Sequence, residues 1–312
     1  MSPVAINETA APVEPASHPL KAAAPVDNGH KQDLDKLAKN PIDRIWRGNK
    51  EGSIRLNTIP DFGNDLLAKR QWVKEHLAAA FQYWGKEGYG EGVAGHITVR
   101  DPVMPDHYWM NPFAVHYSCI TVSKLVLVTP DGYVHPDGAQ LPINTAGFHI
   151  HSAIHEERPE VQAIAHCHSL HGKAWSVFGR PIDMLVQDSC FFYDNLAVYK
   201  SFGGIVLAQE EGTNIAKAMG KKHKTAILQN HGLLTLGDSV FDCVYLFSLL
   251  ERLCKMQLMV EAAEANGIKK TLIADEDAAF TAATLQDPCS TYVGFQTEYD
   301  CLKQQLGNWW LK

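Results

Sequence analysis

The chain has 312 residues, of which 46% are hydrophobic and 20% charged, so a sizeable buried core is expected. Its net charge of −7 argues against nucleic acid or an anionic membrane as a partner, because both favour clustered Lys and Arg side chains. No apolar stretch approaches the roughly 20 residues that a membrane span requires. Seven cysteines without a Cys-x-x-Cys pair, and no signal peptide, indicate a reduced, cytoplasmic protein.

Three segments are expected along the chain. Residues 1–60 are predicted to form a disordered or extended N-terminal arm, because the first 40 alternate Pro with Ala and acidic residues and hold few large apolar side chains. Residues 61–268 alternate helix and strand patterns, which predicts a single α/β domain. Residues 269–312 are expected to form an accessory C-terminal tail.

The first half of the domain contains clear helix and strand signals. Apolar residues recur at helical spacing from Asn64 to Lys86, and a glycine-rich turn enters a strand that ends at Arg100. A hairpin is expected over 125–134, around the turn sequence Thr-Pro-Asp-Gly. A helix is expected over 145–157.

The second half repeats this alternation. Asn266 and Gly267 would stop a long helix that Asp238 or Ser239 caps and that reaches Ala265. The other expected elements are a strand ending at His166-Cys167-His168, a helix over 170–177, a strand over 204–207, a helix over 213–222 and a bent strand or strand pair over 226–236.

The histidines at the strand ends predict a metal site. Period-2 geometry puts His166 and His168 on one face of a strand, where both imidazoles can reach one ion. His231 also closes an apolar run, and it precedes a glycine. Three imidazoles from two strand ends would bind a metal and leave a coordination position open for substrate.

The order and spacing of several stretches, over about 66–265, resemble the class II aldolase/adducin N-terminal domain family. These stretches are Gly95-His-Ile-Thr-Val-Arg-Asp-Pro102, Phe148-His-Ile-His-Ser-Ala-Ile-His155, Arg158-Pro-Glu-Val161, His166-Cys-His-Ser169 and Asn230-His-Gly-Leu-Leu234.

The resemblance implies a three-layer α/β/α sandwich with a central, mainly antiparallel sheet. It also implies a homotetramer with active sites between subunits. In the family's sugar-phosphate aldolases three His bind a divalent ion, usually zinc, and the matching positions are His166, His168 and His231. Iron and manganese are the other candidate metals.

The chain departs from the sugar-phosphate aldolases at the catalytic acid. Those enzymes carry a Glu eleven residues before the Arg of the Arg-Pro pair, and Gly147 stands at that position here. His151 is the candidate replacement, because a neutral imidazole suits proton transfer near pH 7.

The phosphate cradle is altered as well: its Gly-Asn pair reads Gly95-His96, and its Ser-Ser pair reads Thr145-Ala146. We therefore expect His96, Arg100 and Thr145 to contact an unphosphorylated small-molecule substrate. The alternative for Arg100 is a surface ion pair with Asp101.

These features predict a metal-dependent lyase that cleaves a carbon–carbon bond beside a carbonyl or carboxylate, by decarboxylation or retro-aldol cleavage, through a metal-stabilised enolate. Two alternatives remain open. One is an iron-dependent oxygenase that uses the same His triad, and the other is a non-catalytic, adducin-like interaction protein.

Overall fold

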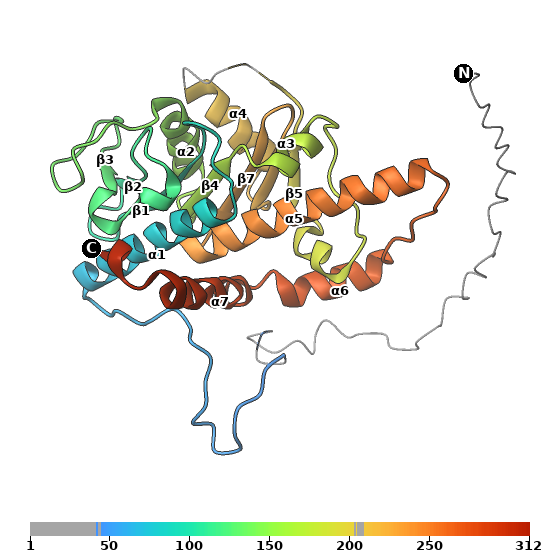
Figure 1. Ribbon diagram of the computed structural model, residues 1–312, viewed down its shortest axis with the longest axis horizontal. Coiled ribbons are helices and arrows are strands. Elements are labelled where there is room, and N and C mark those ends of the chain that lie inside the picture. Colours follow the sequence, from blue (N-terminus) through green and yellow to red (C-terminus); the bar gives the residue numbers. More distant parts are fainter. Residues whose placement is uncertain (1–41, 43–44, 203, 205–208) are drawn as a thin grey trace, which may run out of the picture. The chain divides into compact units, whose positions relative to one another are not determined.

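A seven-stranded sheet runs through the structure (Figure 1). The structure is a computed structural model, and it describes residues 42, 45–202, 204 and 209–312. The strands are β1 (His96–Arg100), β2 (Tyr108–Met110), β3 (Val126–Val128), β4 (Ala163–Cys167), β5 (Leu196–Tyr199), β6 (Thr225–Leu228) and β7 (Gly232–Gly237). Their order is β3-β2-β1-β4-β7-β6-β5, and every neighbouring pair is antiparallel except β5 with β6. The mainly antiparallel α/β sheet is therefore confirmed.

Helices cover both faces of the sheet. They are α1 (Leu66–Lys86), α2 (Thr145–Glu157), α3 (Leu170–Ser176), α4 (Gln209–Met219), α5 (Val240–Ala265), α6 (Asp275–Leu285) and α7 (Pro288–Leu306), with short 3-10 turns η3 (Tyr117–Cys119), η4 (Val122–Lys124), η5 (Gln187–Phe192) and η6 (Trp309–Leu311). Among these described residues, no helix combines the length and apolarity that crossing a bilayer requires.

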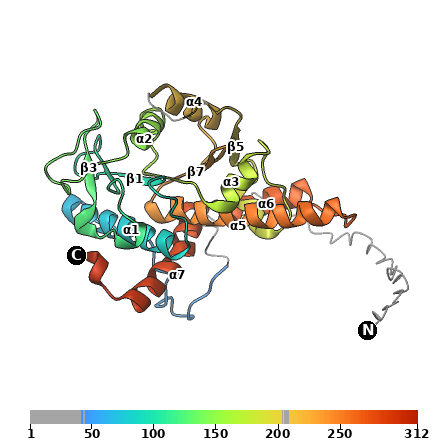
Figure 2. The same ribbon diagram turned by 45° about the horizontal axis from the view of Figure 1, so that its top comes forward.

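Strand β4 shows how the three layers form. Ala163, Ala165 and Cys167 point into the core shared with α1 and α5, whereas Ile164 packs with the apolar side chains of α2 and α4. This alternation follows from the period of two along a strand. Figure 2 shows α2 and α4 on one side of the sheet and α1 and α5 on the other, which is the predicted α/β/α sandwich.

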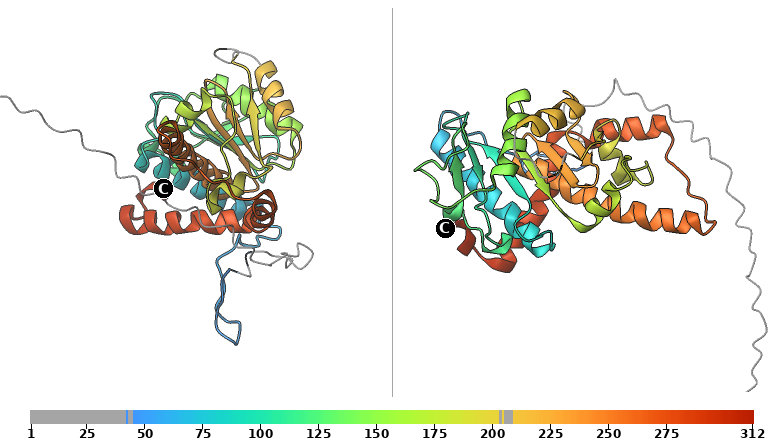
Figure 3. Two further views of the ribbon diagram at one scale, coloured as in Figure 1. Left: turned by 90° about the vertical axis from the view of Figure 1, so that its right-hand side faces the viewer. Right: turned by 90° about the horizontal axis from the view of Figure 1, so that it is seen from above.

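Helix α7 packs against α1 and α5 on the outer side of their layer (Figure 3). Phe295 of α7 is fully buried, with its ring centroid 4.8 Å from that of Phe241 and 5.0 Å from that of Tyr83. Trp310 is also buried, near Tyr299, so the C-terminal segment contributes to the main core.

Some segments differ from their predictions. The turn expected near residue 130 forms, because Gly132 N–H donates to the carbonyl of Thr129 at 2.9 Å, but the return strand is reduced to a bridge between Val128 and Val134. The chain then follows the edge of β3, where His135 N–H donates to Leu127 O at 2.8 Å and Ala139 N–H donates to Leu125 O at 2.9 Å.

Helix α4 lies several residues before the predicted 213–222. Glu210 and Glu211 in its first turn favour an early start, because acidic side chains stabilise a helix N-terminus. It ends at Met219 because Gly220 takes a left-handed φ of 60°. The expected strand over 204–207 falls largely outside the described residues.

The N-terminal arm lies largely outside the described residues as well. Residues 45–60 contain no helix or strand. The domain boundaries at residues 60 and 268 remain predictions.

Replacing Phe295 with alanine should destabilise the fold. Phe295→Ala removes a fully buried ring between α1, α5 and α7 and leaves a cavity, which lowers the free energy of unfolding by about 3–5 kcal/mol. Urea denaturation followed by circular dichroism measures the change. The matched control is Gln304→Ala, at an exposed position of the same helix; equal stability of the two variants would contradict the packing described.

Acid should destabilise the protein through His76, whose ring lies 4.0 Å from Trp72 and 4.1 Å from Phe241, centroid to centroid. Burial lowers the pKa of His76 to about 4, whereas a histidine in an unfolded chain titrates near 6.5. As pH falls from 7 to 5 the unfolded chain binds this proton and the folded chain does not, so stability decreases.

Urea denaturation at both pH values should therefore show a smaller loss in His76→Phe than in the wild type, by about 1–2 kcal/mol. His116→Gln, which replaces an exposed imidazole, is the control and should keep the wild-type loss. A wild-type loss in His76→Phe would disprove this linkage.

Candidate metal centre

Three histidines meet at one end of β4 and β7. His166 is the fourth residue of β4, His168 follows that strand, and His231 stands directly before β7. Because β4 and β7 are antiparallel neighbours, the end of one lies beside the start of the other. The three ligand nitrogens lie within 4.8 Å of one another. The structure thus brings together all three residues that were predicted to hold a metal, here called the triad.

The turn between β6 and β7 positions His231. Asn230 has a φ of 57°, in the left-handed region that asparagine tolerates better than most residues. The His231 N–H donates to the carbonyl of Leu228 at 3.0 Å, which closes the turn. The Gln-Asn-His-Gly sequence therefore presents the third imidazole at the strand end.

The donor set fits a divalent metal ion. His166 Nδ1 lies 2.8 Å from the carbonyl of Leu233, which can only accept, so Nδ1 carries the hydrogen and Nε2 keeps its lone pair for a metal. Burial lowers the pKa of His166 and lowers that of His231 to about 4. Both rings are therefore neutral at pH 7, as metal ligation requires.

A buried carboxylate from α5 holds the turn that carries His168. Glu251 accepts hydrogen bonds from Ser169 Oγ at 2.6 Å, from the His171 N–H at 2.9 Å and from the Gly172 N–H at 2.6 Å. Sequence reasoning missed this residue, because it lies about 80 positions from its partners. The available signal was one acidic residue within an apolar stretch of helix.

His96 lies beside the triad. It pairs with His166 across β1 and β4, and the two ring centroids are 5.2 Å apart. A Cβ atom on Gly147 would come within 2.2 Å of His96 Cδ2 and Nε2. The imidazole of His96 thus fills the space next to residue 147, where the resembling aldolases carry their catalytic Glu.

His151 and Thr145 both come from α2 and lie at different depths. His151 is completely buried and contacts His96 through Nε2 at 3.0 Å and Thr98 through Nδ1 at 2.8 Å. Counted from the triad, His151 therefore comes after His96 in this series of hydrogen-bonded side chains. Thr145 is exposed at the first turn of α2, two residues before Gly147.

Arg100 is not brought to the triad. It lies four residues beyond His96 on β1, a distance of about 13 Å along an extended strand. Its Nη1 donates to Pro105 O at 2.8 Å and its Nη2 to His155 O at 3.0 Å, and it lines a separate cavity of about 430 Å³. The alternative pair with Asp101 does not form, because Arg70 binds that carboxylate.

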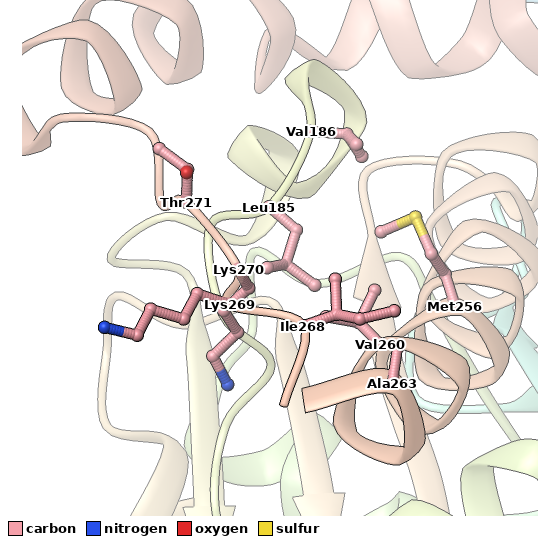
Figure 4. Close-up of a pocket in the computed structure, with 9 residues that line it drawn as sticks. All are labelled: Leu185, Val186, Met256, Val260, Ala263, Ile268, Lys269, Lys270 and Thr271. Atoms are coloured by element: carbon pink, nitrogen blue, oxygen red, sulfur yellow. The ribbon is translucent and has the colours of Figure 1, made fainter. Parts of the chain in front are cut away.

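Another cavity, of about 260 Å³, lies between the end of α5 and the loop before η5. Leu185, Met256 and Val260 provide apolar walls, and the ammonium groups of Lys269 and Lys270 point away from Met256 (Figure 4). No triad histidine lines this cavity, so it is not part of the metal centre.

An α/β/α sandwich with histidines converging at its strand ends defines a class of metal-site proteins. The chain belongs to one family of that class, described as the Class II Aldolase and Adducin N-terminal domain, which matches residues 75–258. The matched range contains the whole sheet and all three triad histidines.

Curated relatives include fungal and bacterial proteins. The chain is 42% identical over 216 residues to the meiotically up-regulated gene 14 protein of Schizosaccharomyces pombe, covering 69% of this chain and 83% of that one. It is 40% identical over 195 residues to two Streptomyces proteins, covering 62% of this chain each time. These are the 4-hydroxy-3-prenylphenylpyruvate oxygenase/4-hydroxy-3-prenylbenzoate synthase of S. roseochromogenus subsp. oscitans (70% covered) and decarboxylase NovR of S. niveus (72% covered).

Among solved structures, the L-fuculose 1-phosphate aldolase from Glaciozyma antarctica PI12 superposes with a TM-score of 0.74 at 39% sequence identity. The match covers 81% of this chain and 97% of that one. Class II aldolases are metal-dependent, and within the residues that the structure describes the triad is the place where three potential metal ligands converge.

The triad should bind one divalent ion per chain. Isothermal titration of metal-stripped protein with Zn²⁺ should give one equivalent for the wild type, and His166→Ala or His231→Ala should lose at least about 100-fold in affinity. His135→Ala is the control, because His135 lies in the loop after β3 and outside the triad. Stoichiometric binding of undiminished affinity in both triad variants would place the metal elsewhere.

Proposed function

We propose that the chain is a metal-dependent lyase that cleaves a carbon–carbon bond next to a carbonyl or carboxylate of a small molecule. The convergence of His166, His168 and His231 within 4.8 Å carries this proposal. A divalent cation held there, for which we propose zinc, would stabilise the negative charge left on oxygen when the bond breaks. Three neutral protein ligands would leave room for substrate oxygens.

The residues around the triad would bind and orient the substrate. His96 is the imidazole nearest to His166 on the β1 side, and we assign it direct contact with substrate. His151 is completely buried and hydrogen-bonds to His96, so its proposed role is to position the His96 ring. Thr145, exposed at the N-terminus of α2, is the proposed contact for an outer polar group of the substrate.

Decarboxylation is favoured over retro-aldol cleavage. Gly147 supplies no carboxylate for proton transfer, and His96 leaves no room for a side chain at that position. Loss of carbon dioxide needs stabilisation of charge more than it needs a base, since no hydroxyl proton has to be removed. A relative that is 40% identical is named a decarboxylase, which supports this choice.

A second candidate is an iron-dependent oxygenase that uses the same triad. The observation in its favour is the 40% identical relative named an oxygenase/synthase. The metal identity therefore separates the two candidates. For either one we propose a cytoplasmic homotetramer that acts on a small molecule.

Product formation with and without oxygen tests these proposals. Protein loaded with Zn²⁺, Mn²⁺ or Fe²⁺ is incubated with 2-oxo acids, 2-hydroxy acids and 4-hydroxy-3-prenylphenylpyruvate, under nitrogen and in air, while carbon dioxide, aldehydes and oxygen are measured. A lyase should release carbon dioxide or aldehyde under nitrogen, and His166→Ala should lower the rate at least about 100-fold.

Turnover that requires both iron and air would instead support the oxygenase. A folded, metal-loaded protein without turnover under any of these conditions would contradict both enzymatic proposals and favour an adducin-like interaction protein. His135→Ala again serves as the control that keeps the triad intact.

A further inference from the structure

A chain of buried polar side chains leads from His96 along the contact between β1 and α2. His96 Nδ1 lies 3.0 Å from His151 Nε2, and His151 Nδ1 lies 2.8 Å from Thr98 Oγ1. The same hydroxyl lies 3.1 Å from His155 Nε2. The two elements meet in this way because alternate residues of a strand and residues four apart on a helix each share one face.

Each ring in the chain holds one ring hydrogen. All three rings are buried, and no carboxylate of the described residues forms a hydrogen bond or ion pair with any of them. Because an unpaired buried charge is costly, each imidazole is neutral, with one N–H donor and one nitrogen acceptor. Thr98 has a single hydroxyl hydrogen for its two histidine neighbours. A hydroxyl oxygen can accept from two donors, but Thr98 Oγ1 has no other acceptor for its hydrogen within the described residues, so it donates to one ring and accepts from the other. The hydrogen bonds therefore all run in one direction, either from His155 to His96 or the reverse.

Arg100 sets this direction at the outer end. Its Nη2 lies 3.4 Å from His155 Nδ1 and donates to the carbonyl of the same residue at 3.0 Å. A guanidinium group only donates, so Nδ1 of His155 must accept.

The remaining hydrogens then follow in order. His155 carries its hydrogen on Nε2 and donates to Thr98 Oγ1, so the Thr98 hydroxyl donates to His151 Nδ1. His151 in turn carries its hydrogen on Nε2 and donates to His96 Nδ1. The hydrogen of His96 is consequently on Nε2, the atom beside Gly147.

We propose that Arg100, Thr98, His155 and His151 are positioning residues that fix His96 as a hydrogen-bond donor towards a substrate oxygen beside the triad. His96 Nε2 makes no hydrogen bond within the described part of the chain, so this N–H is free to meet a ligand. A neutral imidazole donor stabilises developing negative charge without giving up its proton. This inference deepens the proposed function, on which it rests for the presence of substrate at that place.

The tautomers of the three rings test the proposal directly. Metal-free protein labelled with ¹⁵N in the histidine rings is studied at pH 7 by two-bond ¹H–¹⁵N correlation spectra, with signals assigned from single His→Gln variants. In the wild type, His96, His151 and His155 should all carry the hydrogen on Nε2. Thr98→Val should release His96 and His151 into mixed tautomers while His155 keeps its form.

Arg100→Met should release all three rings, since the cation that orients them is gone. Tyr108→Phe is the matched control: it removes only a hydroxyl 3.5 Å from Arg100 Nη1, keeps the ring that stacks on His155, and should leave all tautomers unchanged. Hydrogen on Nδ1 of His96 in the wild type, or wild-type tautomers in both Thr98→Val and Arg100→Met, would overturn the proposal.

Because these spectra need neither metal nor turnover, they can fail independently of the lyase proposal. If the predicted tautomers were found in a protein that binds no cation, the lyase proposal would be refuted. The proposed direction of the hydrogen bonds from Arg100 to His96 would still be supported. Metal-dependent turnover with the opposite tautomer of His96 would do the reverse.

Discussion

The pairing of β4 with β1 on one side and with β7 on the other is the interaction on which the candidate site depends. Its register sets His166 opposite both His96 and Leu234 and brings His231 to the same end of the sheet. Because strand side chains alternate between faces, a slip of one residue would turn His166 towards the α1–α5 core. The apolar residues of β4, buried on both faces, hold this register and so hold the triad.

Local patterns in the sequence predicted the parts of the site that depend on strand ends. The spacing of His166 and His168 and the turn before β7 were enough to expect a three-histidine centre, and both ends of α2 were predicted correctly. The roles of His151 and Arg100 could not be predicted from such local patterns. Each depends on a contact with a residue more than 50 positions away, and one sequence does not show which faces meet.

Residue 147 is a glycine in this chain, and the imidazole of His96 occupies the space beside it. This arrangement changes the chemistry that the family's scaffold offers. A side chain from β1 fills space that would otherwise receive one from α2, so an ionisable carboxylate is replaced by an imidazole that is neutral at pH 7. The sheet and the metal ligands need not move for this change. Under the proposed lyase function, such a site would suit substrates that lose a leaving group such as carbon dioxide and need stabilisation of charge more than a base.

The segment that follows the turn after β3 has a consequence for how copies of this chain can associate. Its N–H groups take the carbonyls of Leu125 and Leu127 that an edge strand would otherwise expose. An unprotected edge strand can pair with a strand from another molecule, and here residues of the same chain occupy those positions instead. A strand from another copy therefore cannot pair with β3 through the carbonyls of Leu125 and Leu127, which guards this edge against open-ended strand addition.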